Sequence, residues 1–265
     1  MDSISFHGAG LRSGKSCAVS MTRSPGPLEL HDASGREITR PWRHRVVASR
    51  LAVALPNGRH LEGVEHLFGA LGGLGIHHGI RIAFSGTELP LLDGAAFELA
   101  LALRALAPPR ARPKVRVAQA GEVLAGTSRY SFEPRPGIEV GVEIKVRGRR
   151  QRVFWSGNAR DFVDRIAPAR LCDAANRSLW TVLQGACYVD PAVIALIRDD
   201  GAVEAPGRPL EDAEVAHHHL LDLLADLYLF GGPPLGRVVA FAPEHAANHY
   251  ALEHALDFGL IQQVT

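Results

Sequence analysis

Three side chains in the last quarter of the chain have the types and the spacing of a metal site or an acid–base site. His218, Asp222 and Asp226 lie four residues apart within Ala216–Leu227, an apolar segment that neither Gly nor Pro interrupts. Its leucines predict a single helix. Because each residue turns about 100° around a helix, the three side chains share a wedge of roughly 80° on one face.

The spacing allows two interpretations of this helix. A neutral imidazole and a carboxylate are suitable zinc ligands, and an open catalytic zinc site needs about three protein ligands. His218 and Asp222 can reach one point in space, while Asp226 could orient a neighbour one turn further on. His219 competes with His218 as a ligand, because it also lies within one turn of Asp222. The alternative is a solvated helix face without a metal.

A second pair of chemical side chains lies in the first half of the chain. Glu65 and His66 are neighbours within Leu61–Leu71, a segment whose apolar residues recur at helical spacing. One interpretation is a buried pair that local hydrogen bonds satisfy. The other is a general base, Glu65, beside a third metal ligand, His66, as in metal-dependent hydrolases.

A Gly-rich segment near the N-terminus, Phe6–Ser16, nearly matches two phosphate-binding motifs. Ala9 stands where a Walker loop needs its first Gly, and the spacing of the glycines does not fit the dinucleotide motif. We therefore predict a turn between two strands, since Ala18–Met21 follows as a short strand.

The composition is that of a globular protein without a general preference for nucleic acid or membrane surfaces. The chain has 265 residues, is 46% hydrophobic and carries a net charge of +1. Cys17, Cys172 and Cys187 lack paired spacing, which is typical of reduced thiols. The chain shows no signal-peptide pattern and no apolar run near the ~18 residues of a membrane span. We expect a cytoplasmic protein that does not span a membrane.

Strand and helix patterns occur in both halves and predict an α+β protein. Ala107–Pro113 has three prolines and no apolar periodicity, so we place a linker at 108–113, between domains at 1–107 and 114–265. Residues 24–46 are predicted to loop over the surface. Ile138–Val146 alternates as a half-buried strand. The basic run Arg147–Arg152, which includes Arg149, follows it as a predicted hairpin tip that is either solvated or in contact with substrate phosphates.

Taken together, the motifs resemble one family. The chain is similar to the UDP-3-O-acyl-N-acetylglucosamine deacetylases, the zinc amidases of lipid A biosynthesis. The matching segments follow the family's order over nearly the whole chain: Gly8–Gly14, Val64–Leu67, Glu88–Gly94, Ile166–Arg170, His218–Tyr228 and Glu244–Asn248.

The resemblance implies a fold, a metal site and a substrate. The fold is two similar two-layer α/β sandwich domains with the active site between them. His66, His218 and Asp222 would bind Zn²⁺, or Fe²⁺, because nitrogen and oxygen ligands suit both ions. The substrate would be an acylated sugar nucleotide, and we expect a monomer that binds no nucleic acid.

The resemblance also implies the acid and the base. Glu65 would be the general base that takes a proton from the attacking water. His245 would be the acid that protonates the leaving amine, and Asp226 would be oriented toward it.

The chain departs from the family at positions that face the substrate. Leu171 stands where a Thr usually helps to hold the oxyanion, and Cys172 where an aromatic residue is common. His219 replaces a Lys, and Arg12 replaces a His in the Gly-rich turn. Residues 178–200 differ from the segment that encloses the acyl chain in the family. Loss of one oxyanion donor typically costs on the order of 10²-fold in rate.

Three functions therefore stand side by side. The first is removal of the N-acetyl group from UDP-3-O-acyl-N-acetylglucosamine. The second is the same zinc amidase chemistry on another N-acyl sugar or secondary-metabolite amide. The third is a non-catalytic binding scaffold, against which the sequence argues, because a binding protein needs neither Glu65 nor His245.

Overall fold

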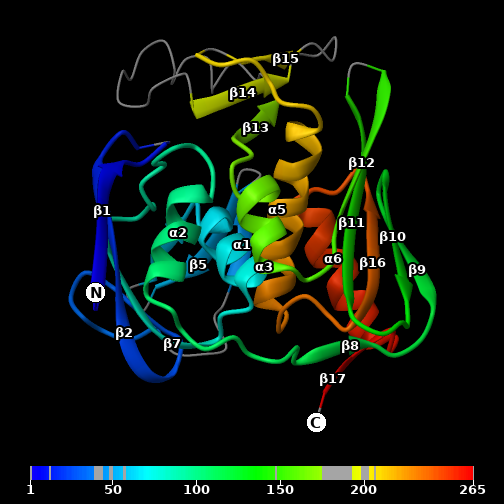
Figure 1. Cartoon of the computed structure of the whole chain (residues 1–265), viewed down its shortest axis with the longest axis horizontal. Helices are drawn as coiled ribbons and strands as arrows, with labels where there is room; N and C mark the ends of the chain where they lie inside the picture. Colours follow the sequence, from blue (N-terminus) through cyan, green and yellow to red (C-terminus); the bar gives the residue numbers. More distant parts are fainter. Residues whose placement is uncertain are drawn as a thin grey trace.

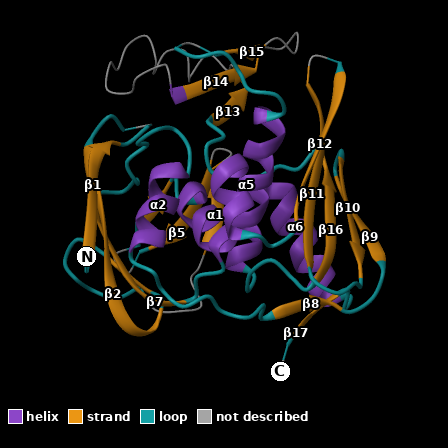
Figure 2. Cartoon of the chain, viewed as in Figure 1, coloured by secondary structure: helices purple, strands orange, loops and turns teal. Residues whose placement is uncertain are grey.

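Helices form the centre of the molecule and β-sheets flank them on both sides. The computed structural model describes residues 2–11, 13–38, 44–47, 50–55, 58–146, 148–174, 193–197, 203–205 and 207–264. Figures 1 and 2 show the helices between a sheet from the first half of the chain and a sheet from the second half. The predicted α+β class is confirmed.

The first half supplies two sheets and two helices. The four-stranded sheet has the order β1-β2-β7-β3, and a three-stranded sheet has the order β4-β5-β6. The bounds are β1 Ser3–Ala9, β2 Ser16–Pro27, β3 Glu29–His31, β4 His44–Val47, β5 Arg50–Ala54, β6 His60–Glu62, β7 His78–Ser85, α1 Glu65–Leu74 and α2 Phe97–Ala105.

The Gly-rich segment is the turn of the β1–β2 hairpin, as predicted, with Ala9 opposite Ser16. A second hairpin joins β5 to β6, since Ala54 pairs with His60; Pro56 and Asn57 between them lie outside the described part. The surface loop predicted for residues 24–46 is wrong in part. β2 continues to Pro27, and β3 pairs in parallel with β7, with Leu30 buried at its centre.

The second half is built on a five-stranded sheet with the order β12-β11-β16-β10-β9. Its bounds are β9 Gly121–Ala125, β10 Ser128–Glu133, β11 Ile138–Val146, β12 Arg149–Trp155 and β16 Gly236–Phe241. Among the described residues of this half, the long helices are α5 Glu214–Leu229 and α6 His245–Asp257. The strand predicted at Ile138–Val146 is therefore β11, and Arg149–Arg152 of the basic run begin β12, next to the tip of the β11–β12 hairpin.

Smaller elements complete the second half. They are β8 Val115–Val117, α3 Ala159–Asp161, a π-helical turn at Phe162–Ile166, β13 Leu171–Ala174, β14 Ile194–Ile197, β15 Val203–Glu204 and β17 Ile261–Gln263. Residues 159–166 thus form a short α-helix that widens into a π-helical turn. Of residues 178–200, which differ from the family's acyl-chain segment, 178–192 and 198–200 lie outside the described residues.

The predicted linker joins α2 to β8. It crosses between the halves close to Ile76, which pairs with Arg110 in an isolated β-bridge. The domain boundary at 108–113 stays a prediction. No helix among the described residues has the length and apolar character needed to cross a membrane.

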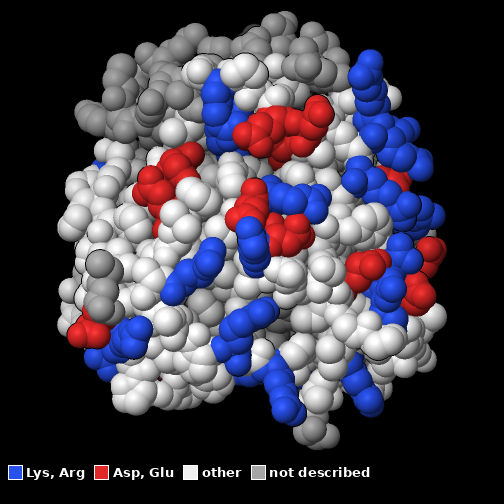
Figure 3. Space-filling view, viewed as in Figure 1, with Lys and Arg blue, Asp and Glu red and all other residues white. Residues whose placement is uncertain are grey.

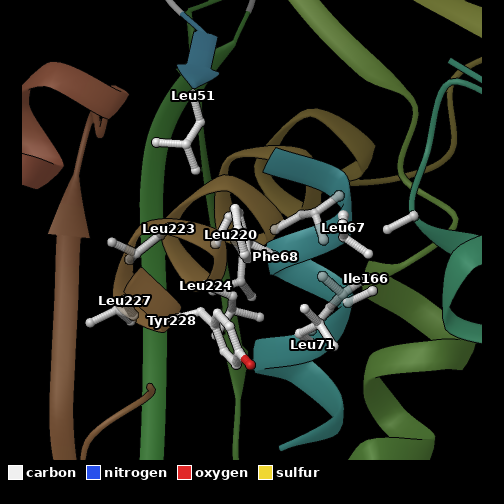
Figure 4. Close-up of a cluster of buried hydrophobic side chains, with 14 of the residues drawn as sticks. Leu51, Leu67, Phe68, Leu71, Ile166, Leu220, Leu223, Leu224, Leu227 and Tyr228 are labelled. Atoms are coloured by element: carbon white, nitrogen blue, oxygen red, sulfur yellow. The ribbon is translucent and has the colours of Figure 1, made fainter. Parts of the chain in front are cut away.

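The packing of α1 against α5 holds the two halves together. Leu67, Phe68 and Leu71 of α1 face the leucines of α5 in a buried cluster, shown in Figure 4. Gly69 and Gly72 let the two backbones approach closely. A Cβ atom on Gly69 would lie 2.9 Å from the Leu221 carbonyl oxygen, and one on Gly72 would lie 2.9 Å from the Leu224 carbonyl oxygen. This contact sets the positions of the polar side chains in the N-terminal halves of the two helices, such as His66 in α1 and His218 in α5.

Candidate active site

Three helices bring the predicted chemical side chains into one buried cluster. Glu65 and His66 are the first two residues of α1, and His245 is the first residue of α6. His218, Asp222 and Asp226 lie on one face of α5, which is continuous as predicted. Five of these six side chains are buried, and Asp222 is half-buried.

His66, His218 and Asp222 adjoin one another across the α1–α5 contact. The rings of His66 and His218 have centroids 5.6 Å apart and are nearly perpendicular. His218 Nε2 lies 3.4 Å from Asp222 Oδ2. Three buried atoms of this group, His66 Nε2, His218 Nδ1 and Asp222 Oδ1, have no hydrogen-bond partner among the described residues. Buried polar atoms are nearly always paired, so these three atoms indicate a missing ligand.

The donors fit a divalent metal in type. Burial lowers the pKa of His66 well below its ordinary value and that of His218 to about 4. Both imidazoles are therefore neutral at pH 7, the form that binds metals, and Asp222 adds a carboxylate. As the side chains stand, no group of three or more His, Cys, Asp and Glu in the described part of the chain could hold a metal ion.

The carboxylate of Glu65 lies at the edge of this group and is held from two sides. Its Oε1 accepts a hydrogen bond from Arg50 Nη1, and its Oε2 accepts one from the backbone N–H of Leu51, both at 3.3 Å. Burial raises the pKa of Glu65, and the nearby Arg50 charge opposes that shift. A carboxylate with a raised pKa is a better proton acceptor than an exposed one.

His245 is paired with a carboxylate on the opposite side of the cluster. Its Nδ1 donates to Asp226 Oδ2 at 2.8 Å, and its Nε2 lies 3.8 Å from Asp222 Oδ1. Burial disfavours a charged imidazole, but Asp226 and Asp222 outweigh it and raise the pKa of His245 to about 10. His245 is therefore protonated at pH 7 and able to donate a proton.

Asp226 is the centre of a buried hydrogen-bond network. Asn248 Nδ2 donates to its Oδ2 at 2.7 Å, and His249 Nε2 lies 2.8 Å from its Oδ1. Tyr130 in turn donates its hydroxyl to Asn248 Oδ1 at 2.6 Å. Burial alone would raise the pKa of Asp226, but its partners, His245 first, lower it to about 2.

Comparison with known proteins identifies the family. The family described as UDP-3-O-acyl N-acetylglycosamine deacetylase matches residues 1–257 of this chain. The chain belongs to this family. Curated relatives include the UDP-3-O-acyl-N-acetylglucosamine deacetylases of Xanthomonas axonopodis pv. citri (strain 306) and Xanthomonas oryzae pv. oryzae (strain PXO99A). Each is 28% identical to this chain over 274 residues, which cover 94% of this chain and 86% of the relative.

The predicted resemblance is thus confirmed. As a member of this deacetylase family, the chain is a hydrolytic enzyme. The identity of 28% with these relatives leaves room for the departures seen at single positions.

Of the four residues predicted to contact the substrate, His219 lies beside the cluster and Arg149 lies on the surface. His219 is half-buried beside the cluster, with its ring 6.4 Å from that of His218, and burial lowers its pKa to about 4. Leu171 is buried at the start of β13, where its N–H donates to the Gly94 carbonyl at 2.6 Å. Cys172 follows it, with its thiol donating to the Arg170 carbonyl at 3.3 Å. Arg149 lies outside the buried cluster.

Arg149 is exposed at the tip of the β11–β12 hairpin. Figure 3 shows Lys and Arg side chains gathered along the edge of the molecule where this hairpin projects. Arg12, the departure in the Gly-rich turn, lies outside the described residues.

Sequence reasoning missed Arg50, Asn248 and Tyr130. Asn248 follows His245 by three residues in α6, so helical spacing alone could have placed it on the same face. Arg50 opens a strand whose next four residues are all apolar, a position where a charge is unusual. Tyr130 gives no such signal, because aromatic residues are common in strands.

Proposed function

We propose that this deacetylase removes the N-acetyl group from UDP-3-O-acyl-N-acetylglucosamine in a metal-dependent reaction of lipid A biosynthesis. The observation that carries the proposal is the buried group of two neutral imidazoles and one carboxylate beside a second carboxylate and a charged imidazole. The names of the curated relatives support this substrate.

In the proposed site, His66, His218 and Asp222 hold the metal, with Zn²⁺ as the expected ion and Fe²⁺ as the alternative. When bound, such an ion lowers the pKa of water and polarises the substrate carbonyl. His66 Nε2, His218 Nδ1 and Asp222 Oδ1 have no hydrogen-bond partner among the described residues, which supports this role.

Two side chains then move the protons of the hydrolysis. Glu65 takes a proton from the water whose oxygen forms the new bond to the acetyl carbon. His245 gives a proton to the amide nitrogen as the C–N bond breaks, which yields acetate and a free amine. Asp226 keeps His245 oriented through the 2.8 Å hydrogen bond to Nδ1.

A second candidate keeps this chemistry and changes the amide that is cleaved. The buried, apolar Leu171 supplies no side-chain donor at the position where the family places a Thr. A different N-acyl sugar or a secondary-metabolite amide would then be the substrate.

The test is acetate release from UDP-3-O-acyl-N-acetylglucosamine by purified protein of known metal content. We expect turnover that a chelator abolishes and Zn²⁺ restores. Fe²⁺ added under anaerobic conditions to the chelated protein compares the two ions. One metal per chain without acetate release would reject the lipid A substrate and favour the second candidate, which a panel of N-acetylated amino sugars would then test.

A further inference from the structure

The buried guanidinium of Arg50 lies beside Glu65, the proposed general base, and takes no part in the proton transfers proposed above. Arg50 is 7% exposed, although Arg is almost never buried unless it is paired. Removing a charged pair from water is costly, and a well-packed apolar pair of similar volume is often as stable or more stable. Stability alone therefore gives no reason for an Arg at this position.

The contact that Arg50 makes is directed at one side chain. Its Nη1 bonds Glu65 Oε1, while the next residue, Leu51, bonds Glu65 Oε2 through its backbone N–H, both at 3.3 Å. The first two residues of β5 thus hold both oxygens of one carboxylate. A carboxylate held at both oxygens has little freedom to rotate.

The support behind these two residues is rigid. The Leu51 side chain is fully buried, and Figure 4 shows it pointing toward Leu220 and Leu223 of α5. Leu51 pairs across the sheet with Val46 of β4, and the next residue along the strand, Ala52, pairs with Glu62 of β6. The backbone that presents the N–H to Glu65 is therefore fixed by core packing and by sheet pairing.

A second buried Arg shows what a purely structural pair looks like in this fold. Arg170 bonds Glu214 through Nε and Nη2, and its Nη1 bonds the Arg208 carbonyl, so every nitrogen of the guanidinium has an acceptor. For Arg50, the described residues provide one side-chain hydrogen bond, to Glu65. Arg170 joins separate segments of the chain, whereas the side-chain hydrogen bond that Arg50 makes within the described part goes to the Glu65 carboxylate.

We propose that Arg50 is a positioning residue that, together with the Leu51 N–H, fixes the Glu65 carboxylate where it takes the proton from the attacking water. This inference rests on the proposed deacetylation. It adds a residue outside the predicted acid, base and ligand set.

The kinetic test is a double-mutant cycle on the metal-loaded enzyme with Arg50→Ala, Glu65→Ala and the double variant. We expect Arg50→Ala to lower kcat by about 10- to 100-fold with KM changed by less than about 3-fold, because a general base contributes roughly 10²- to 10⁴-fold and only its placement is lost. The double variant should be no slower than Glu65→Ala, because Arg50 acts through Glu65. Guanidinium ion added to Arg50→Ala should restore part of kcat.

Matched variants separate this role from a general loss of structure. Arg81→Ala removes an Arg from an exposed ion pair with Glu29 and should leave kcat unchanged. Arg50→Gln keeps an N–H donor and replaces the Ala variant if that protein does not fold. Metal content, measured by mass spectrometry, should equal one per chain in every variant. Additive losses in the double variant, or a wild-type kcat in Arg50→Ala, would overturn the proposal.

A crystal structure of metal-loaded Arg50→Ala tests the placement without any substrate. We expect the Glu65 carboxylate to rotate away from its wild-type position. A carboxylate that stays in place overturns the inference, whatever the substrate is. If the carboxylate moves while the wild-type enzyme releases no acetate from the sugar nucleotide, the proposed substrate is wrong and the positioning role of Arg50 stands.

Discussion

The three carboxylates of this site, Asp226, Glu65 and Asp222, have different hydrogen-bond partners. Asp226 is fully buried, and three polar side chains direct nitrogen atoms at its two oxygens. Glu65 has one cation and one backbone donor, and Asp222 has an unpaired oxygen. These environments separate the roles of the three carboxylates: one orients an acid, one accepts a proton and one is free to bind a ligand.

Replacing Asp226 tests the first of these roles. We expect Asp226→Asn to lower kcat on the order of 10²-fold, because an amide neither stabilises the charged imidazole of His245 nor holds its Nδ1–H as firmly. Metal content should not change. Steady-state kinetics at pH 7, with metal analysis of the same samples, measures both effects.

Asn248→Ala is the control for this variant. It removes one donor to the Asp226 carboxylate, a hydrogen bond to a charged group worth about 1.5–3 kcal/mol of folding stability, but it leaves the contact of Asp226 with His245 in place. The loss in kcat should therefore be smaller than that of Asp226→Asn. Equal rates for Asp226→Asn and the wild type would remove Asp226 from the mechanism.

The sequence predicted the ionisable residues of the cluster better than their supports. Helical spacing alone placed His218, Asp222 and Asp226 on one face, and the structure agrees. Only the fold reveals the partner of Arg50, because Glu65 lies fifteen residues further on, in a different element. The assignment of the metal ligands stays a prediction.

At the scale of elements, the contact between α1 and α5 sets the distance between the candidate metal ligands. His66 lies on α1, whereas His218 and Asp222 lie on α5. The two backbones come close at Gly69 and Gly72, where a Cβ atom would lie 2.9 Å from a carbonyl oxygen of α5. A change in the spacing of the two helices should therefore change the distance between His66 and His218, although neither Gly is itself a candidate metal ligand.

Gly72→Ala tests this spacing. Ala would be favoured over Gly in an isolated helix by about 1 kcal/mol, but its Cβ would lie 2.9 Å from the Leu224 carbonyl oxygen, a backbone atom that cannot rotate away. Overpacking costs about 1–3 kcal/mol, so we expect a net loss in the free energy of unfolding. We also expect weaker metal binding. Urea unfolding and competition with a chelator measure the two effects.

Leu101→Ala on the exposed face of α2 is the control, with an expected change within about 0.5 kcal/mol. A Gly72→Ala protein with higher stability and unchanged metal affinity would show that the helices can separate without consequence.

Elements with one regular apolar face were predicted, and elements with mixed patterns were missed. The leucines of α5 identified the helix, but its first residue could not be located, because Ala213 precedes it without a side-chain cap. β9 was missed because Leu124, 68% exposed, interrupts the alternation around the buried Val123. β3 follows Pro25 and Pro27, which indicate a loop when no partner strand is known.

At the scale of the whole molecule, both halves of the chain are needed to assemble the site. Glu65 and His66 come from the first half, and His245 and the α5 residues come from the second. The sequence predicted a site between the halves only through the family resemblance. Sequence spacing fixes the geometry within one helix, but the contact of two distant helices depends on tertiary packing.

A buried ion pair secures the entry to α5 and makes the stability of the whole chain depend on pH. Glu214, the first residue of α5, accepts hydrogen bonds from Arg170 Nε at 2.8 Å and from Arg208 Nη2 at 2.9 Å. Burial would raise the pKa of Glu214, but the bonds from Arg170 and from the Glu211 N–H outweigh it, and the pKa lies below its ordinary value. The charged form is therefore the one that stabilises the fold.

We expect Glu214→Gln to reduce the free energy of unfolding at pH 7 by about 3–5 kcal/mol, because the Arg170 charge stays buried without its counter-charge. A carboxyl group with a lowered pKa in the folded state contributes its full stability above the pKa of the unfolded chain, roughly 4.3 for Glu, and loses it as the pH falls through the lowered value. The difference between wild type and Glu214→Gln should therefore be constant near neutral pH and shrink below about pH 4.

Urea unfolding from pH 7 to pH 3 measures this difference. Asp164→Asn, which breaks the exposed pair with Arg160, should cost less than about 1 kcal/mol over the same range, because water screens that pair. A difference between wild type and Glu214→Gln that grows as the pH falls would contradict the assigned direction of the pKa shift. A difference below about 1 kcal/mol at pH 7 would mean that the backbone carbonyls of Arg208 and Pro209 hold Arg170 without the carboxylate, and that the other packing contacts of α5 are enough to anchor it.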